Sequence, residues 1–592
     1  MGETGAPRWR LDNIYRGFDS KEYRDALSTL KEEITALREA VKASGAWLQG
    51  AVERLNRAST TAESLESFAY ATYSTDTSDS RALKELDQLN ELVVGLRDGR
   101  VRLRSRLAKE ADSLGRLWQP GGELEAYAQI LEEEISFAGY QMGVEEENLA
   151  ADLNRSGGEL WSRLQESVSS ELSALWDPES GERKSVTELR ALAFNPDRSV
   201  REQAYQEELR LWESMETPLA HALNGVKGFA STINKRRGHQ SDLERAVMQS
   251  RLSRRGLDAM IGVMEESLPL FRSYLKEKAK LLDLERIAFF DLFAPVGGEE
   301  KSWSWNEAEA FIVDRFGRFS PDLADLARKA FSENWIDGQP RRGKVGGAYC
   351  TSLPAFGQSR ILANFDGSFS SVSTLAHELG HAYHFEVIKE EPALLRDYPM
   401  TLAETASIFC ETHVFYTRVE EETNEPLPIL EHFLQESTQV IVDILSRFYF
   451  ENSLFAERES GFLSAARLKE LMLDAQEQTY GDGMDPDLRH PYMWAVKGHY
   501  YRPELGFYNF PYAFGQLFGL GLYAQYLEDP EGFPPRYREI LKLTGRAPAQ
   551  EVAGSAGFDL ESPEFWRSAI SLIKGFEERF SEAVAAELGQ RG

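Results

Sequence analysis

The sequence predicts a mainly α-helical protein with one small β-sheet. Most of the chain carries apolar residues at spacings of three and four, which is the pattern of amphipathic helices. The first such stripe can be capped at its start by Asp19 or Ser20, and it consists of Tyr23, Leu27, Leu30, Ile34, Leu37 and Val41. Further stripes run through residues 52–110, 121–175, 200–232, 254–282 and 304–332. Such stripes face a core, so they predict the fold class and indicate no function.

The strongest strand signal lies within residues 347–365. Two short runs, 348–351 and 361–365, flank a segment that contains Pro354 and Gly357. Two apolar runs around a turn of this composition are typical of a β-hairpin. We therefore predict a small sheet at this point of the chain.

The composition predicts a folded protein with a large core and an acidic surface. The chain has 592 residues, of which 42% are hydrophobic, and its formal net charge is −29. A surface of this charge repels nucleic-acid phosphates and anionic lipid headgroups. We therefore expect neither a nucleic acid nor a membrane as a partner.

The sequence also predicts where the protein works. Residues 1–10 lack the apolar run of a signal peptide. The nearest candidate for a membrane span, residues 512–527, is interrupted by glutamines and rich in glycine. The only two cysteines, Cys350 and Cys410, favour a reduced cytoplasmic protein, with one disulfide between them as the alternative.

One motif contains the candidate metal ligands and the candidate general base. His377 and His381 are four residues apart, so on a helix they share a face and can hold one zinc ion together. Glu378, beside the first histidine, can act as the general base toward a zinc-bound water. His384 lies seven residues beyond His377, about 10 Å along a helix axis, so we predict a packing or supporting role for it.

A zinc site in a hydrolase needs a third protein ligand. A helix predicted at residues 401–418 offers Glu404, Glu411 and His413. We favour Glu404 because its neighbours are small and permit close helix packing. Glu411 shares a face with Glu404, so it either orients a ligand histidine or is an ordinary solvated carboxylate.

A second cluster lies at residues 498–515, where histidine and several tyrosines stand among glycines and prolines. Peptide hydrolysis builds negative charge on the carbonyl oxygen, and phenol or imidazole groups can stabilise it. His499, Tyr508 and Tyr512 are candidates for this role. An aromatic-rich core or loop is the alternative interpretation.

Three segments resemble the M3 family of zinc oligopeptidases, and most of all its oligoendopeptidase F group. They are residues 365–384 around the histidine motif, residues 404–407 around Glu404, and residues 507–515 around the two tyrosines. The likeness extends over roughly residues 120–590. It implies two helical lobes that enclose a deep substrate channel, a hairpin edge that pairs with substrate, and endopeptidase action on oligopeptides.

The resemblance also implies a role for each residue. His377, His381 and Glu404 would be the ligands of one Zn²⁺ ion, and Glu378 the base. Catalytic assistance would come from His499, Tyr512 and a further tyrosine, for which Tyr508 is the choice and Tyr500 and Tyr501 the alternatives. The domain organisation expected with it is an N-terminal helical region (1–115), an N-terminal lobe (116–195) and a catalytic domain (196–592).

The sequence thus predicts a zinc-dependent endopeptidase that acts on oligopeptides. A non-catalytic peptide-binding protein is one alternative, and an exopeptidase is another, although no motif announces a group that captures a substrate terminus. Two histidines and a carboxylate also suit cobalt or manganese.

Overall fold

The computed structural model describes residues 5–297, 301–421 and 427–591. Part of the N-terminal stretch on which the signal-peptide expectation rests lies outside these residues. The chain divides into two compact units, each assembled from three segments. The first consists of Met1–Gly139, Glu300–Glu421 and Phe518–Asp559, and the second of Tyr140–Glu299, Glu422–Leu517 and Leu560–Gly592.

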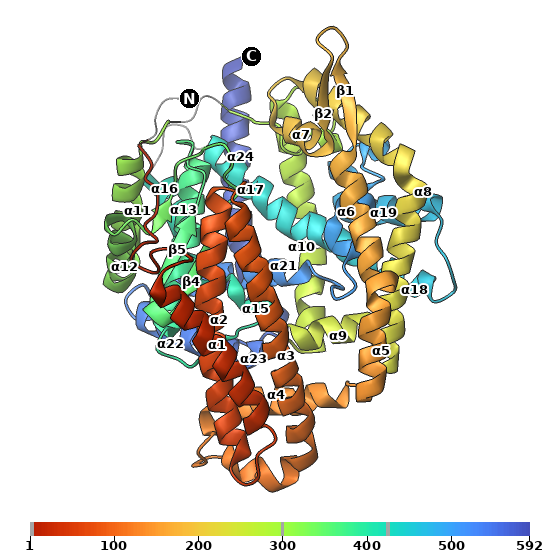
Figure 1. Cartoon of the computed structure of the whole chain (residues 1–592). Helices are drawn as coiled ribbons and strands as arrows, with labels where there is room; N and C mark the ends of the chain where they lie inside the picture. Colours follow the sequence, from red (N-terminus) through yellow and green to blue (C-terminus); the bar gives the residue numbers. More distant parts are fainter. Residues whose placement is uncertain (1–4, 298–300, 422–426, 592) are drawn as a thin grey trace. The chain divides into compact units, whose positions relative to one another are not determined.

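The first unit is built mainly of helices (Figure 1). Three long antiparallel helices open it, and its later segments add shorter helices and a small sheet. The helices are α1 (Lys21–Ala40), α2 (Trp47–Thr75), α3 (Ser80–Leu114), α4 (Ala128–Gly139), α11 (Trp305–Phe319), α12 (Pro321–Ser332), α13 (Phe369–Ile388), α14 (Ala393–Arg396), α15 (Met400–Ala403), α16 (Thr405–Glu421), α22 (Phe533–Leu543) and α23 (Ala549–Ser555).

Helix ends in this unit follow local chemistry. Ser20 caps α1 by accepting a hydrogen bond from the backbone N–H of Tyr23. The predicted stripe 52–110 is two helices, because Asp76 adopts an extended conformation and Asp79 caps α3. The stripe 304–332 is likewise divided, because Pro321 forces an extended conformation on the residue before it.

The small sheet of the first unit has three strands in the order β3–β5–β4. These are β3 (Ile336–Asp337), β4 (Tyr349–Leu353) and β5 (Gln358–Leu362). β4 and β5 form an antiparallel hairpin, and β3 pairs with β5 in parallel. The predicted hairpin is confirmed, with its strands shifted by one to three residues. β4 is an edge strand, and no other strand within the described residues pairs with its free side.

The second unit is also mainly helical (Figure 1). Its helices are α5 (Val144–Asn154), α6 (Leu160–Glu171), α7 (Val186–Ala191), α8 (Arg198–Arg236), α9 (Asp242–Gln249), α10 (Arg254–Leu281), α17 (Leu427–Thr438), α18 (Ile444–Arg458), α19 (Ala465–Tyr480), α20 (Met493–Val496) and α24 (Pro563–Arg591). The boundary between the units falls within α21 (Phe510–Glu528).

The stripe at 121–175 was predicted as helical throughout, and this is wrong at its end. Residues from 173 form a hairpin of β1 (Ser173–Asp177) and β2 (Glu182–Ser185). Gly181 has φ +75°, which lets the chain reverse between the strands. The side chain of Lys184 lies over the ring of Trp176 and stabilises the pairing across the hairpin.

A buried ionic cluster lies in the core of the second unit. Glu208 on α8 accepts hydrogen bonds from Arg190 (2.7 Å) and Trp212 (3.1 Å), and its Oε1 lies 3.2 Å from His490 Nε2. Burial alone would raise the pKa of Glu208, but the charges of His490 and Arg190 outweigh it and lower that pKa to about 2. The carboxylate is therefore ionised in the folded protein.

Both cysteines are free thiols in the first unit. None of the helices within the described residues is long and apolar enough to cross a lipid bilayer. The fold class predicted from the sequence, mainly α with a small sheet near the histidine motif, is confirmed.

Candidate active site

The histidine motif lies on α13, and a short turn sets where this helix begins. The Ser368 hydroxyl accepts a hydrogen bond from the backbone N–H of Ser371, and Asp366 accepts one from the N–H of Ser368. Gly367 has φ +88°, and a Cβ there would lie 3.0 Å from the carbonyl oxygen of Trp303. Only glycine fits this turn without strain.

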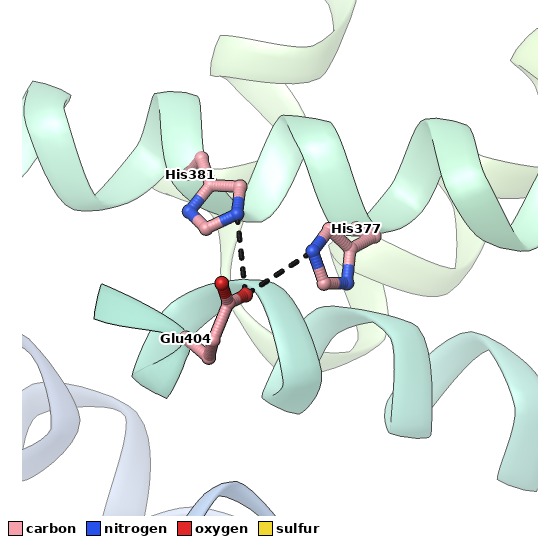
Figure 2. Close-up of side chains that lie close together, drawn as sticks. All are labelled: His377, His381 and Glu404. Atoms are coloured by element: carbon pink, nitrogen blue, oxygen red, sulfur yellow. Dashed lines mark ion pairs between the residues drawn. The ribbon is translucent and has the colours of Figure 1, made fainter. Parts of the chain in front are cut away.

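Three side chains in the first unit converge on one point (Figure 2). The Nε2 atoms of His377 and His381 lie 3.2 and 3.3 Å from Glu404 Oε2. One ligand atom from each residue lies within 4.8 Å of the others, and no other group of this kind occurs within the described residues. Ligand atoms in tetrahedral zinc coordination at about 2.1 Å are about 3.4 Å apart. The cluster therefore has the size and the donor types that a zinc ion requires.

Close packing of two helices brings Glu404 to the histidines. A Cβ on Gly380 of α13 would lie 2.6 Å from Ala406 O and from Ser407 Cα at the start of α16. The predicted helix 401–418 is interrupted at Glu404, which has φ −87° and ψ 2° and separates α15 from α16. Its carbonyl oxygen accepts the N–H of Ile408, so Glu404 stands at the entrance of α16.

Hydrogen bonds hold the clustered side chains in place. Glu411 Oε2 lies 2.9 Å from His377 Nδ1, so the other ring nitrogen faces the cluster. The hydroxyl of Ser373 donates to Glu411 Oε1, and that of Ser407 donates to Glu404 Oε2 at 2.7 Å. Of the two interpretations left open for Glu411, the contact with His377 favours orientation of a ligand histidine.

The electrostatics of the cluster favour a cation. Burial alone would lower the pKa of His377, but the facing carboxylates of Glu404 and Glu411 raise it well above its usual value. Burial alone would raise the pKa of Glu404, but its hydrogen bonds to His377 and His381 hold it far below its usual range. Two carboxylates thus face two imidazoles, which is a suitable surrounding for a divalent ion.

Glu378 has the properties of a proton acceptor. It is 6% exposed, and its Oε2 has no hydrogen-bond partner within the described residues. Burial raises the pKa of Glu378, although His377 and His381 partly offset this. A carboxylate with a free oxygen and a raised pKa can take up a proton and release it again.

The two other histidines considered from the sequence lie away from this cluster. His384 is fully buried, stacks on Tyr398 and hydrogen-bonds Thr544 Oγ1 at 2.8 Å. His413 Nε2 lies 2.8 Å from the carbonyl oxygen of Arg315. Burial lowers the pKa of His384 to about 3 and that of His413 to about 4. Both are therefore neutral packing residues.

The second predicted cluster lies in the second unit, and its members are close to one another. The hydroxyl oxygens of Tyr508 and Tyr512 are 2.8 Å apart, and the ring of His499 lies 5.5 Å from that of Tyr508. All three side chains are partly exposed. Tyr500 and Tyr501, in contrast, are fully buried, and their hydroxyls have no hydrogen-bond partner within the described residues. Tyr508 is thus the better candidate for the further tyrosine.

The backbone is strained directly before Tyr508. Phe507 has φ +53°, which is rare for an aromatic residue. Its ring is buried against Phe448 and Phe455, and this packing holds the unfavourable conformation in place. The positive φ of Phe507 turns the backbone between the segment that contains His499 and the start of α21.

Sequence reasoning missed several residues around these clusters. Gly380 could have been found, because glycine inside an otherwise apolar helix indicates close packing. Asn509 contacts His499 Nε2 with its side-chain amide at 2.7 Å, and no local pattern predicts this. The seryl hydroxyls of Ser373 and Ser407 were likewise not predicted as contacts of the two glutamates.

The sequence profile of peptidase family M3 matches residues 191–572, which is more than half of the chain and includes all the residues of both clusters. The chain belongs to peptidase family M3. As a member of this family it is a metallopeptidase, and the sequence-based family assignment is confirmed.

Curated relatives of this M3 peptidase are bacterial oligopeptidases. Oligopeptidase PepF of Bacillus subtilis is 24% identical over 486 residues, covering 80% of this chain and 71% of the relative. Chromosomal oligoendopeptidase F of Lactococcus lactis subsp. cremoris is 26% identical over 402 residues, covering 66% of this chain and 65% of the relative. The group B oligopeptidase PepB of Streptococcus agalactiae is 27% identical, with 66% of this chain and 65% of the relative covered.

Solved structures share the fold of this M3 peptidase. A protein of Chlamydophila abortus matches with a TM-score of 0.82 and 21% identity, covering 97% of this chain and 98% of its own. Oligoendopeptidase-F from Enterococcus faecium matches with a TM-score of 0.68 and 18% identity, covering 98% of this chain and all of its own. Both matches extend over almost the whole chain.

Proposed function

We propose that this M3 peptidase is a zinc-dependent endopeptidase that hydrolyses internal bonds of oligopeptides. The observation that carries the proposal is the convergence of His377, His381 and Glu404. Beside them lies the buried carboxylate of Glu378, whose Oε2 has no hydrogen-bond partner within the described residues. This combination is what hydrolysis by an activated water requires. The names of the curated relatives support an oligopeptide as the substrate.

His377, His381 and Glu404 would hold the zinc ion. Once bound, zinc would supply Lewis acidity toward a water molecule and toward the scissile carbonyl. Glu411 keeps the imidazole of His377 turned so that Nε2 is available. Two nitrogens and one carboxylate oxygen are a donor set that zinc takes in hydrolases.

Glu378 would transfer the proton from the attacking water to the leaving group. Its free Oε2 takes a proton from the attacking water and passes it to the nitrogen of the departing amine. Burial raises its pKa, which makes the carboxylate a stronger proton acceptor. No other described carboxylate combines burial, a free oxygen and a position beside the two histidines.

His499, Tyr508 and Tyr512 would hydrogen-bond the substrate and the carbonyl oxygen that becomes negative during attack. Their partial exposure and mutual proximity support this role. We also propose that the free edge of β4 binds substrate backbone as an added strand.

The proposal also includes a cellular location and a domain organisation. A cytoplasmic location is supported by the two free thiols. A catalytic domain from about residue 196 is supported by the start of the family match at residue 191. The expected domains 1–115, 116–195 and 196–592 are continuous stretches of sequence. They differ in kind from the two compact units, each of which is assembled from three separate segments.

Mass spectrometry of a mixed oligopeptide pool tests the proposal. The purified protein is incubated with the pool in three ways: untreated, with chelator, and with chelator followed by added zinc. Internal cuts that stop with chelator and return with zinc are expected. Stepwise loss of terminal residues would indicate an exopeptidase, and peptide binding without cleavage by a zinc-loaded protein would indicate a peptide-binding protein.

A further inference from the structure

A chain of polar contacts in the second unit ends on His499. Asp443, the last residue of the π-helical segment Gln439–Asp443 before α18, forms an ion pair with Arg447 of that helix. Arg447 Nη1 donates to Asn509 Oδ1 at 2.9 Å. The side-chain nitrogen of Asn509 lies 2.7 Å from His499 Nε2. All four residues belong to the second unit.

The donor and acceptor groups of Arg447, Asn509 and His499 allow only one arrangement of these hydrogen bonds. A guanidinium group only donates hydrogen bonds, so the amide oxygen of Asn509 has to face Arg447. The amide nitrogen then faces His499, and an amide nitrogen also only donates. His499 Nε2 has to accept, and a neutral imidazole that accepts at Nε2 carries its hydrogen on Nδ1.

The surroundings of His499 oppose its protonation. Burial, followed by the positive charges of Arg447, Lys227 and Lys497, lowers the pKa of His499 to about 2. A proton added to Nε2 would also meet the N–H of the Asn509 amide. His499 is therefore neutral throughout the physiological pH range.

We propose that Asn509 and Arg447 are positioning residues that fix His499 as a neutral hydrogen-bond donor through Nδ1–H. This inference rests on the proposed function, in which His499 contacts the substrate. A fixed N–H stabilises developing charge on oxygen without giving up its proton. His499 thus acts as a permanent donor, and proton transfer is left to Glu378.

Nitrogen-15 NMR of the full-length protein, labelled at histidine, tests the tautomer without reference to activity. The signals of His499 are assigned by their loss in a His499→Gln variant. We expect a neutral ring with a protonated Nδ1 and an unprotonated Nε2, unchanged between about pH 5.5 and 8.5. Free imidazole side chains prefer the opposite tautomer and titrate within this range. A protonated Nε2 in the wild-type protein would overturn the inference.

Asn509→Asp tests the positioning role. A carboxylate accepts where the amide donated, so the neutral ring of His499 should carry its hydrogen on Nε2 and leave Nδ1 without one. The expected result is a fall in kcat of about 100-fold, as for the loss of one oxyanion donor, with KM within about threefold. Gln516→Glu is the matched control, because it makes the same change at a buried amide in α21 that bonds Ser437.

The outcomes separate this inference from the function on which it rests. An Asn509→Asp protein with wild-type His499 signals would overturn the positioning role. An Asn509→Asp protein no less active than Gln516→Glu would also overturn it, provided that His499→Gln itself loses activity. If Asn509→Asp changes the His499 signals while His499→Gln retains full activity, the positioning stands and the catalytic role of His499 is wrong. Arg447→Lys, which keeps a donor toward Asn509, should preserve the Nδ1–H signal, whereas Arg447→Met should lose it.

Discussion

Replacing Gly380 by alanine should weaken metal binding without touching a ligand. The new Cβ would lie 2.6 Å from Ala406 O and Ser407 Cα, about 0.8 Å closer than ordinary contact at 3.4 Å. Both are backbone atoms, so α16 has to move away from α13, and Glu404 moves with it. Overpacking of this kind costs about 1–3 kcal/mol. If metal binding has to restore the original spacing, this energy corresponds to an affinity loss of about 5- to 150-fold.

Zinc affinity is measured by competition with a chromogenic chelator after the resident metal has been removed. Gly50→Ala is the control, since Gly50 lies in α2 of the same unit and a Cβ there has no neighbour within 4 Å. That control should bind zinc as the wild type does and be more stable by up to about 1 kcal/mol. A Gly380→Ala protein that binds zinc within twofold of the wild type would refute the role of close packing at this position.

Three further predictions concern the surroundings of the two clusters. Glu411→Gln should lower zinc affinity about tenfold by removing the charge that orients His377; unchanged affinity in the chelator assay would contradict this. Tyr508→Phe should lower kcat about 100-fold. Tyr501→Phe, which removes a buried hydroxyl without a described partner, should leave kcat unchanged. Equal effects of the two variants on kcat would argue against the catalytic role of Tyr508. Glu208 has a folded-state pKa of about 2 against 4.5 in the unfolded chain, so its stabilisation is complete above about pH 4.5 and is lost as pH falls toward 2. The difference in free energy of unfolding between wild type and Glu208→Gln, measured by denaturant titration, should therefore shrink by about 2 kcal/mol from pH 6 to pH 3. A difference that stays constant over this range would show that the carboxylate is not stabilised by its partners.

The parts of the site that depend on helix periodicity could be predicted from the sequence. The spacing of His377 and His381 is enough to place them on one face of a helix, because that relation is local. The choice of Glu404 rested on the small residues around it and on the resemblance of residues 404–407 to the M3 family. Its position in a break between α15 and α16 could not be foreseen, because the break accompanies the packing of α16 against α13.

Relations between distant segments were beyond sequence reasoning. Asn509 receives its orientation from Arg447, which is 62 positions earlier in the chain. The burial of Tyr500 and Tyr501, which separates them from Tyr508, depends on the core of the second unit. The hairpin of β1 and β2 was missed because its strands are short and carry no clear alternation.

The most direct test of the account is the Glu378→Gln variant, measured for bound zinc and for turnover in the same preparation. Glutamine preserves the size of the side chain but cannot accept the proton, while His377, His381 and Glu404 are untouched. We predict one zinc ion per chain, as in the wild type, with kcat for a cleaved oligopeptide reduced by about 1,000-fold or more. Substantial turnover by the zinc-loaded variant would contradict the central claim that Glu378 serves a metal held by these three residues.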